Sequence, residues 1–256
     1  MTTDTCDQQT KSLVSSCYAP LPRANGYVLY RGPSKIDGKP IVMIATGFKT
    51  GSGNVKTGAM IQTWILREDV EPHTAQKTGD DESICGNCPH RGGSCYVVTF
   101  QAPLAIYRAY HRGIYPTVKP SQIATLFADK VVRFGAYGDP FAIPVAIWKA
   151  IATVAKARTG YTHQWKRAPY LRQLVMASVD NEEEYHLARS KGWRTFRVRT
   201  PDAPLDPGEI TCPASHEGGQ RTTCADCTLC DGARSEDGRK AVSIIVHGRG
   251  AGQFVA

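Results

Sequence analysis

Seven of the nine cysteines in this 256-residue chain fall into two groups. The first group is Cys85, Cys88 and Cys95, and the second is Cys212, Cys224, Cys227 and Cys230. The N-terminus lacks the apolar core of a secretory signal, so we expect a cytoplasmic protein. In a reducing compartment, closely spaced cysteines bind metal or do redox chemistry more often than they form disulfides. The two groups are therefore candidate metal sites.

The second group combines a CxxCxxC run with one more distant cysteine, Cys212. This spacing matches a short loop that wraps a [4Fe-4S] cluster, because successive thiolates then bind different irons. Zinc is an alternative, although zinc ribbons usually place their cysteines as two well-separated pairs, and free thiols are another. Either metal would make this cysteine-rich tail fold together with its ion.

The first group supplies three thiolates and then stops, whereas a closed tetrahedral site needs four ligands. His90 lies inside the group and could complete a zinc site of three thiolates and one imidazole. The alternative is a [4Fe-4S] cluster in which one iron has no protein ligand. An open coordination position of that kind is where a small molecule binds and reacts.

A segment that reads as a buried strand, VVRFGAYGDP, follows the first group and ends in Gly138, Asp139 and Pro140. This arrangement resembles the radical S-adenosylmethionine superfamily, in which a three-cysteine loop holds a [4Fe-4S] cluster and a later strand ends in Gly-Gly-Glu-Pro. The spacing differs, because the superfamily loop is normally CxxxCxxC and Tyr137 stands in place of the first glycine. The resemblance implies that the three cysteines hold the cluster. It also implies an S-adenosylmethionine site that includes Tyr96, Gly138, Asp139 and Pro140.

Two further stretches extend the resemblance. The run Ser178–Asp180 is similar to later strand ends of the same barrels, and the second cysteine group is similar to the auxiliary-cluster extensions of some members. The text NVKTGAMIQTWIL followed by CGNCPHRGGSCY resembles a group of phage-encoded, cysteine-rich proteins of unassigned activity. The sequence thus favours a radical-SAM-like enzyme acting on an unidentified nucleotide, nucleic acid or peptide. The alternative is a non-enzymatic zinc or iron-sulfur protein that binds nucleic acid.

Hydrophobic periodicity predicts an α/β fold. Asp37-Gly38 lies between two apolar runs, which is a strong hairpin signal. After residue 100, strand-like runs alternate with helical ones, which indicates a parallel sheet, either open or as a partial (β/α) barrel. The expected strands are 131–138, 161–166, 174–180, 193–200 and 242–248, and the expected helices are 101–113, 120–130, 145–158 and 182–191.

We divide the chain into four segments. These are a flexible leader (1–25, with Cys6 and Cys17), a β-rich segment (26–80), an α/β partial barrel with the first cysteine group (81–205), and the cysteine-rich tail with a final strand (206–256). The net charge of +8 permits binding to a nucleotide or nucleic acid. No run is long and apolar enough to span a membrane.

Other residues carry weaker signals. The glycine-rich stretch 51–58 lacks phosphate-loop spacing, so we interpret it as a surface turn. His247 and then His163 are the best histidine candidates, because each is expected near the end of a strand. Asp180 is expected to cap the following helix with Glu183. Arg197 and Arg199 either line a basic interior or face solvent.

Overall fold

The computed structural model describes residues 21–255. Most of the expected flexible leader, with Cys6 and Cys17, lies outside these residues. The last leader residues are in contact with the rest of the chain. Tyr27 donates a hydrogen bond from its hydroxyl to the carbonyl oxygen of Pro22 over 2.8 Å, and Leu21 packs against the hydrophobic core.

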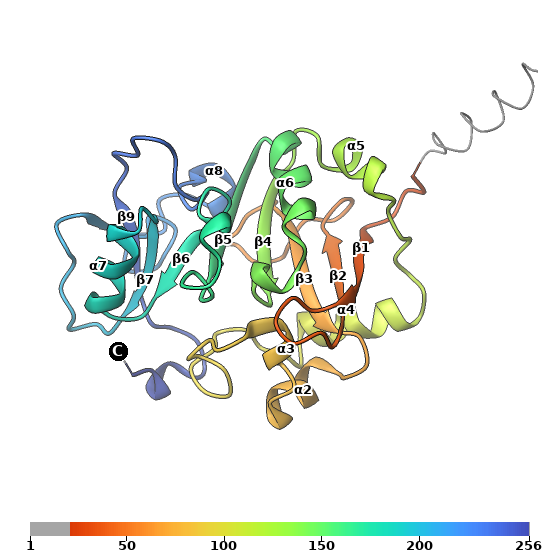
Figure 1. Cartoon of the computed structure of the whole chain (residues 1–256), viewed down its shortest axis with the longest axis horizontal. Coiled ribbons are helices and arrows are strands. Elements are labelled where there is room, and N and C mark those ends of the chain that lie inside the picture. The colour runs from red at the N-terminus through yellow and green to blue at the C-terminus, as the bar shows by residue number, and fades with distance from the viewer. Residues whose placement is uncertain (1–20, 256) are drawn as a thin grey trace, which may run out of the picture.

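The fold is a mixed α/β structure with a nine-stranded, mostly parallel sheet (Figure 1). The strands are β1 (Gly26–Pro33), β2 (Pro40–Thr46), β3 (Ile61–Arg67), β4 (Val131–Tyr137), β5 (Ala157–Thr162), β6 (Met176–Val179), β7 (Thr195–Arg199), β8 (Glu209–Thr211) and β9 (Ala241–Ile245). The α-helices are α2 (Pro72–Thr78), α3 (Glu82–Cys85), α4 (Ala102–His111), α5 (Ile123–Phe127), α6 (Val145–Val154), α7 (Glu182–Ser190) and α8 (Cys224–Cys227). Short 3₁₀ turns are η1 (Pro120–Gln122), η2 (Pro140–Ala142), η3 (Pro169–Leu171) and η4 (Ala251–Gln253).

The predicted hairpin is confirmed. Strands β1 and β2 pair antiparallel from Gly26↔Thr46 to Pro33↔Pro40. The turn works because Gly38 adopts a φ of 79°, which glycine tolerates without steric cost, and Asp37 accepts a hydrogen bond from the Lys39 amide over 3.1 Å. β3 then adds antiparallel to β2.

From β3 onward the pairings are parallel, and the order across the sheet is β3-β4-β5-β6-β7-β9-β8. Among the described strands, β1 and β8 are the two edges and do not pair with each other, so the sheet is open and does not close into a barrel. The carboxyl ends of β3 to β9 therefore meet along one edge, where parallel sheets bind ligands.

Two predicted elements need correction. The helix expected over 145–158 ends at Val154, because Ala155 is extended and Ala157–Thr162 forms β5. The strand expected at 161–166 is accordingly earlier than predicted. The tail contributes the expected final strand as β9, and it adds a further strand, β8, to the main sheet. None of the described helices is long and apolar enough to cross a membrane.

The helices α6 and α7 cover one face of the sheet. On β4 the residues alternate, so that Phe134 packs against Trp148 of α6 with ring centroids 4.5 Å apart. Tyr185 and Ala188 of α7 are buried in the same core. Arg133, Gly135 and Tyr137 point the other way, into a cavity. One face of the sheet is thus core, and the other is free to line a site.

The predicted cap of α7 is wrong. Asn181, not Asp180, is the N-cap, and its side-chain oxygen accepts a hydrogen bond from the Glu184 amide over 2.8 Å. Asp180 is one residue earlier, directly after β6, and its carboxylate is directed to two histidines instead.

Candidate functional site

All seven cysteines of the two groups line one cavity of about 430 Å³. The cavity lies against the sheet face opposite α6. Most of the strand residues that line it alternate in sequence, as one sheet face requires: Arg133, Gly135 and Tyr137 of β4, Thr159 and Tyr161 of β5, Phe196 and Val198 of β7, and Val242 and Ile244 of β9. Ala136 of β4 and Ser178 of β6 line it as well. Two candidate metal sites that are more than a hundred residues apart in sequence therefore face a common space.

The first cysteine group is fixed to the ends of β4 and β5. Cys85 ends α3, and the preceding carbonyl, that of Ile84, accepts a hydrogen bond from the Asp139 amide over 2.6 Å. The Cys85 carbonyl accepts a hydrogen bond from Gln164 Nε2 over 3.1 Å. Arg91 braces the loop by donating to the Gly86 carbonyl over 2.9 Å. These bonds hold the loop beside the Gly138-Asp139 turn.

The second group is fixed to the opposite part of the sheet. Cys212 directly follows β8, and its amide donates to the Ser243 carbonyl of β9 over 2.8 Å. The Cys230 carbonyl accepts a hydrogen bond from the Gly160 amide of β5 over 3.0 Å. Because β8 is parallel to β9, Cys212 emerges at the same edge as the first group.

The glycine-rich stretch 51–58 is a largely exposed turn, as predicted, and three of its residues also line the cavity. The carbonyl oxygen of Lys56 accepts a hydrogen bond from the Cys224 amide over 2.9 Å, and that of Thr57 accepts one from Ala225 over 3.1 Å. Asn54, Lys56 and Thr57 line the cavity. The Lys56 charge favours the thiolate forms of Cys212 and Cys224.

Burial makes the thiols poor acids. It raises the pKa of Cys95 to about 11 and that of Cys230 to about 12, and it raises the pKa of Cys85 well above the ordinary value. Neighbouring cysteines add to the shift of Cys85 by charge repulsion. Thiolates gathered in such a place need a strong positive charge, which a bound metal supplies.

The distances between the cysteine sulfurs bear on which metal the two groups could bind. A tetrahedral zinc site places its sulfurs about 3.8 Å apart, given a zinc–sulfur bond of about 2.3 Å. Within residues 21–255, no three cysteine sulfurs lie within 4.8 Å of one another. A cluster whose irons are bound by separate thiolates spaces its sulfurs more widely. The described cysteine sulfurs are thus not arranged as a tetrahedral zinc site.

His90 does not complete a zinc site with the first group, contrary to that alternative. Its Nδ1 lies 2.7 Å from Ser94 Oγ, and its Nε2 lies 2.9 Å from Asp180 Oδ1. Both ring nitrogens are thus engaged with partners other than the cysteines.

The turn after β4 can accept only glycine at its first position. Gly138 has a φ of 83°, and a Cβ there would lie 2.7 Å from the Ile65 Cβ. Asp139 is buried, and its carboxylate accepts hydrogen bonds from Phe141 N, Thr162 Oγ1 and His163 N over 2.9, 2.7 and 2.8 Å. A carboxylate has about four acceptor positions, so one is left toward the cavity. The Pro140 carbonyl is bound by Trp148 Nε1 over 2.8 Å.

Tyr96 and His247 form an aromatic wall between the two cysteine groups. Their rings stack with centroids 5.6 Å apart. The Tyr96 hydroxyl accepts a hydrogen bond from Arg133, which has no carboxylate partner among the described residues. The sequence singled out Tyr96 and His247 but gave no sign that Arg133 belongs with them.

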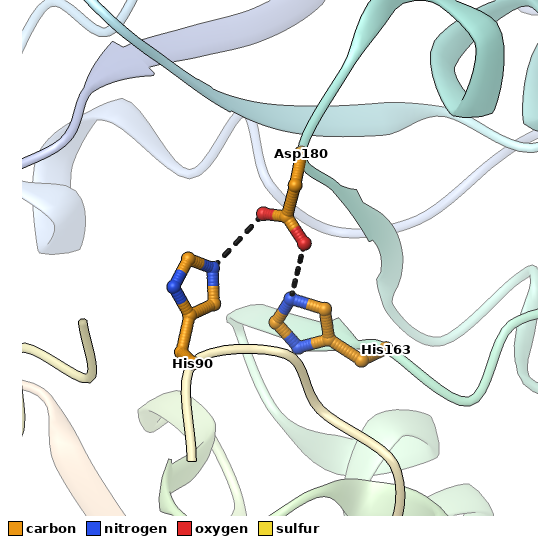
Figure 2. Close-up of side chains that lie close together, drawn as sticks. All are labelled: His90, His163 and Asp180. Carbon is orange, nitrogen blue, oxygen red and sulfur yellow. Dashed lines mark hydrogen bonds and ion pairs between the residues drawn. The ribbon is translucent and has the colours of Figure 1, made fainter. Parts of the chain in front are cut away.

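Three other side chains meet next to the first group (Figure 2). Asp180 lies between His90 and His163, with its two carboxylate oxygens 2.9 Å and 3.4 Å from their Nε2 atoms. The pKa of Asp180 is lowered, because hydrogen bonds from His163 and His90 outweigh burial. The pKa of His163 is raised despite its burial, because Cys88 and Asp180 are close. The sequence named these residues separately, His90 as a possible zinc ligand, His163 as a residue near a strand end and Asp180 as a helix cap, and did not indicate that they meet.

Arg197 and Arg199 neither line the cavity nor face solvent. The Arg197 guanidinium forms a buried bidentate pair with Glu209, with N–O distances of 2.9 and 2.5 Å. Arg199 donates to the carbonyl oxygens of Thr200, Pro201 and Ala203. Both are structural, and the expected basic interior is not found there.

No family model, curated protein or solved structure matches the chain. The interpretation of the site therefore depends on its own residues and geometry.

Proposed function

We propose that the chain is an iron-sulfur enzyme of the radical-SAM type, with one [4Fe-4S] cluster at Cys85, Cys88 and Cys95. The observation that carries the proposal is that a three-cysteine loop is hydrogen-bonded to the glycine turn after β4, on the wall of a cavity. A cluster held by three thiolates supplies, when bound, an iron with an open position and one electron for a bound S-adenosylmethionine. We include in this proposal the interpretation of the open sheet as a partial (β/α) barrel.

The chain's own residues prepare the site for a cosubstrate. Gly138 allows close approach of the main chain, and the remaining acceptor position of Asp139 suits an ammonium group. Tyr96 offers an aromatic surface beside Cys95. We assign these residues, with Pro140, to binding of S-adenosylmethionine.

The second group, Cys212, Cys224, Cys227 and Cys230, supplies four thiols and is proposed to hold a second [4Fe-4S] cluster. This group is buried, and a tyrosine hydroxyl and two cationic side chains lie near it. Tyr161 is hydrogen-bonded to Cys230, while Lys56 and Arg133 place positive charge near Cys224. Positive charge stabilises a cluster whose thiolates carry negative charge.

The substrate is proposed to bind between the two groups. Arg133 reaches this space with most of its hydrogen-bond donors unused, so a phosphate or carboxylate of the substrate suits it. A nucleotide, a nucleic acid end or an acidic peptide meets this requirement. A non-enzymatic zinc protein that binds nucleic acid fits less well, because the cysteines line an interior cavity and their spacing does not match zinc.

The first test is metal content. Protein purified without oxygen should contain iron and acid-labile sulfide, and Cys95→Ala and Cys227→Ala should each remove about half of the iron, because each group would hold one cluster. Stoichiometric zinc without iron would reject the proposal in favour of the zinc alternative. Loss of all iron in either variant would mean that the two groups form one site.

The second test is reaction. With reductant and S-adenosylmethionine, the iron-loaded protein should release 5′-deoxyadenosine, and Cys95→Ala should not. If the iron-loaded protein neither binds nor cleaves S-adenosylmethionine, the proposal of an enzyme is rejected, and the clusters have an electron-transfer or structural role.

A further inference from the structure

His90, His163 and Asp180 come from three separate segments and converge at one point (Figure 2). His90 lies in the loop of the first cysteine group, His163 directly follows β5, and Asp180 directly follows β6. One ligand atom from each lies within 4.8 Å of the other two. Such convergence of two imidazoles and a carboxylate is typical of a site for a divalent metal ion.

The hydrogen bonds leave this cluster incomplete. Asp180 Oδ2 and His163 Nε2 are both buried and pair with each other over 3.4 Å, and among the described residues neither of these two atoms makes a hydrogen bond of ideal geometry. Asp180 is 5% exposed. A buried pair at this distance leaves both atoms only weakly satisfied. Both atoms are therefore available to a metal ion.

The orientation of His90 also suits a ligand. Its Nδ1 lies 2.7 Å from Ser94 Oγ, which can hold that nitrogen as the protonated one. Without an ion, Nε2 donates to Asp180 Oδ1 over 2.9 Å. When Nδ1 carries the proton instead, the Nε2 lone pair is available to a cation placed between it and Asp180. A hydrogen bond from the far nitrogen of a metal-bound histidine is the usual way in which its orientation is fixed.

The cluster is accessible from two sides. His90 and His163 line the main cavity, while His163 and Asp180 line a smaller hollow of about 70 Å³ with Asn87 and Lys166. An ion held here would keep coordination positions open toward the cavity.

We propose that His90, His163 and Asp180 bind one divalent transition-metal ion, separate from the cysteine sites. Two imidazoles and one carboxylate suit iron(II), zinc or manganese(II), and three protein ligands leave positions for water or an oxygen of the substrate. The ion would also fix the loop of the first cysteine group to the ends of β5 and β6. The proposal does not depend on the identity of the metal bound by the cysteines.

Manganese(II) is the probe of choice, because thiolates are soft ligands that suit it poorly. Titration of the purified full chain with manganese(II), followed by the electron paramagnetic resonance signal of the free ion, should show one bound ion per chain. Asp180→Asn should weaken binding by at least about 10-fold, since even outer-shell changes have effects of that size. Asp206→Asn is the matched control and should bind normally, because its group with Glu182 and His186 is largely exposed.

His90→Gln provides a second variant if Asp180→Asn does not fold, and it should weaken binding likewise. Absence of binding to the wild type overturns the proposal, as does normal binding to both variants. Iron and sulfide are counted in the same samples. Manganese binding by a protein that contains no iron therefore supports this metal site and rejects the proposed function. A protein that contains iron and sulfide but binds no manganese supports the proposed function and rejects this metal site.

Discussion

The main-chain nitrogen of Cys224 donates a hydrogen bond to the carbonyl oxygen of Lys56 over 2.9 Å. This bond joins the glycine-rich loop after β2 to the second cysteine group, more than 160 residues later in the chain. Thr57 accepts a second bond, from Ala225, so two consecutive main-chain pairs connect the segments. The loop therefore positions the start of α8, and changes in the loop should affect the second group first.

Gly58→Ala should disturb the second group and leave the first intact. Gly58 has a φ of 65°, and a Cβ there would lie 2.9 Å from Thr223 Oγ1, the N-cap of α8. Left-handed backbone costs alanine about 1–2 kcal/mol, before the steric conflict is added. We expect loss of about half of the bound iron, since one cluster is affected, as measured by iron and sulfide analysis.

Gly53→Ala is the matched control in the same loop. No atom lies within 4 Å of its Cβ position and its φ is not in the left-handed region, so its metal content should equal that of the wild type. Equal metal content in Gly58→Ala and the wild type would show that the loop does not position α8.

Gly86→Ala should disturb the first cysteine group. A Cβ on Gly86 would lie 2.6 Å from Gln164 Nε2, the atom that donates to the Cys85 carbonyl. Gln164 is buried and cannot move aside easily. The variant should lose the iron of the first group and, with it, any cleavage of S-adenosylmethionine.

Gly92→Ala tests a glycine of positive φ in the same loop that has no such steric conflict; Gly86 differs from it in carrying a ψ of −138°, which adds backbone strain of its own. Gly92 has a φ of 70°, close to the 61° of Gly86, but nothing lies within 4 Å of its Cβ position. It should lose only about 1–2 kcal/mol of stability from the left-handed backbone and keep its iron. If both variants keep their iron, the contact between Gln164 and Cys85 does not hold the loop.

Asp139→Asn tests whether the Asp139 carboxylate, a candidate ligand of S-adenosylmethionine, also stabilises the fold. Asp139 accepts three hydrogen bonds with both oxygens, and an amide would replace one acceptor with a donor. A buried donor facing another donor costs about 1–3 kcal/mol. Urea unfolding should therefore show a lower free energy of unfolding than in the wild type, while exposed Asp202→Asn should have no effect. An unchanged value for Asp139→Asn would mean that the three bonds contribute nothing to stability.

The sequence predicted features that are encoded locally. The Asp37-Gly38 hairpin follows from turn chemistry, and the strands at 131–138 and 174–180 follow from short apolar runs with clear ends. The side chains that follow these strands were also placed at the correct edge, because parallel strands end together. His163 was recognised in this way, whereas Asp139 was assigned from the resemblance to the Gly-Gly-Glu-Pro motif.

Relationships that depend on the pairing of distant segments could not be predicted. Nothing in the order of residues indicates that β8 lies parallel to β9, and it is this pairing that brings Cys212 to the edge near the first group. The prediction of the α7 N-cap was wrong for a related reason. Asp180 and Asn181 are both good caps by residue type, and only the positions of His90 and His163 show which of them is engaged elsewhere.

Glu209→Gln should be among the most destabilising single changes. The Glu209 side chain is fully buried and pairs with Arg197 through two hydrogen bonds, and it also accepts one from the Asp206 amide over 3.0 Å. Replacing the carboxylate leaves a buried guanidinium without a counter-charge, which costs about 3–5 kcal/mol.

The matched control for this change is Arg108→Gln on α4. Arg108 is 60% exposed and lies 3.7 Å from Glu71, and loss of such a surface pair costs less than about 1 kcal/mol. Urea unfolding of both variants compares the two pairs directly.

Because β8 carries Glu209 and leads directly into Cys212, Glu209→Gln should also lower the metal content of the second cysteine group. A variant that is as stable as the wild type would contradict the assignment of Arg197 and Glu209 as the buried pair that fixes this edge of the sheet.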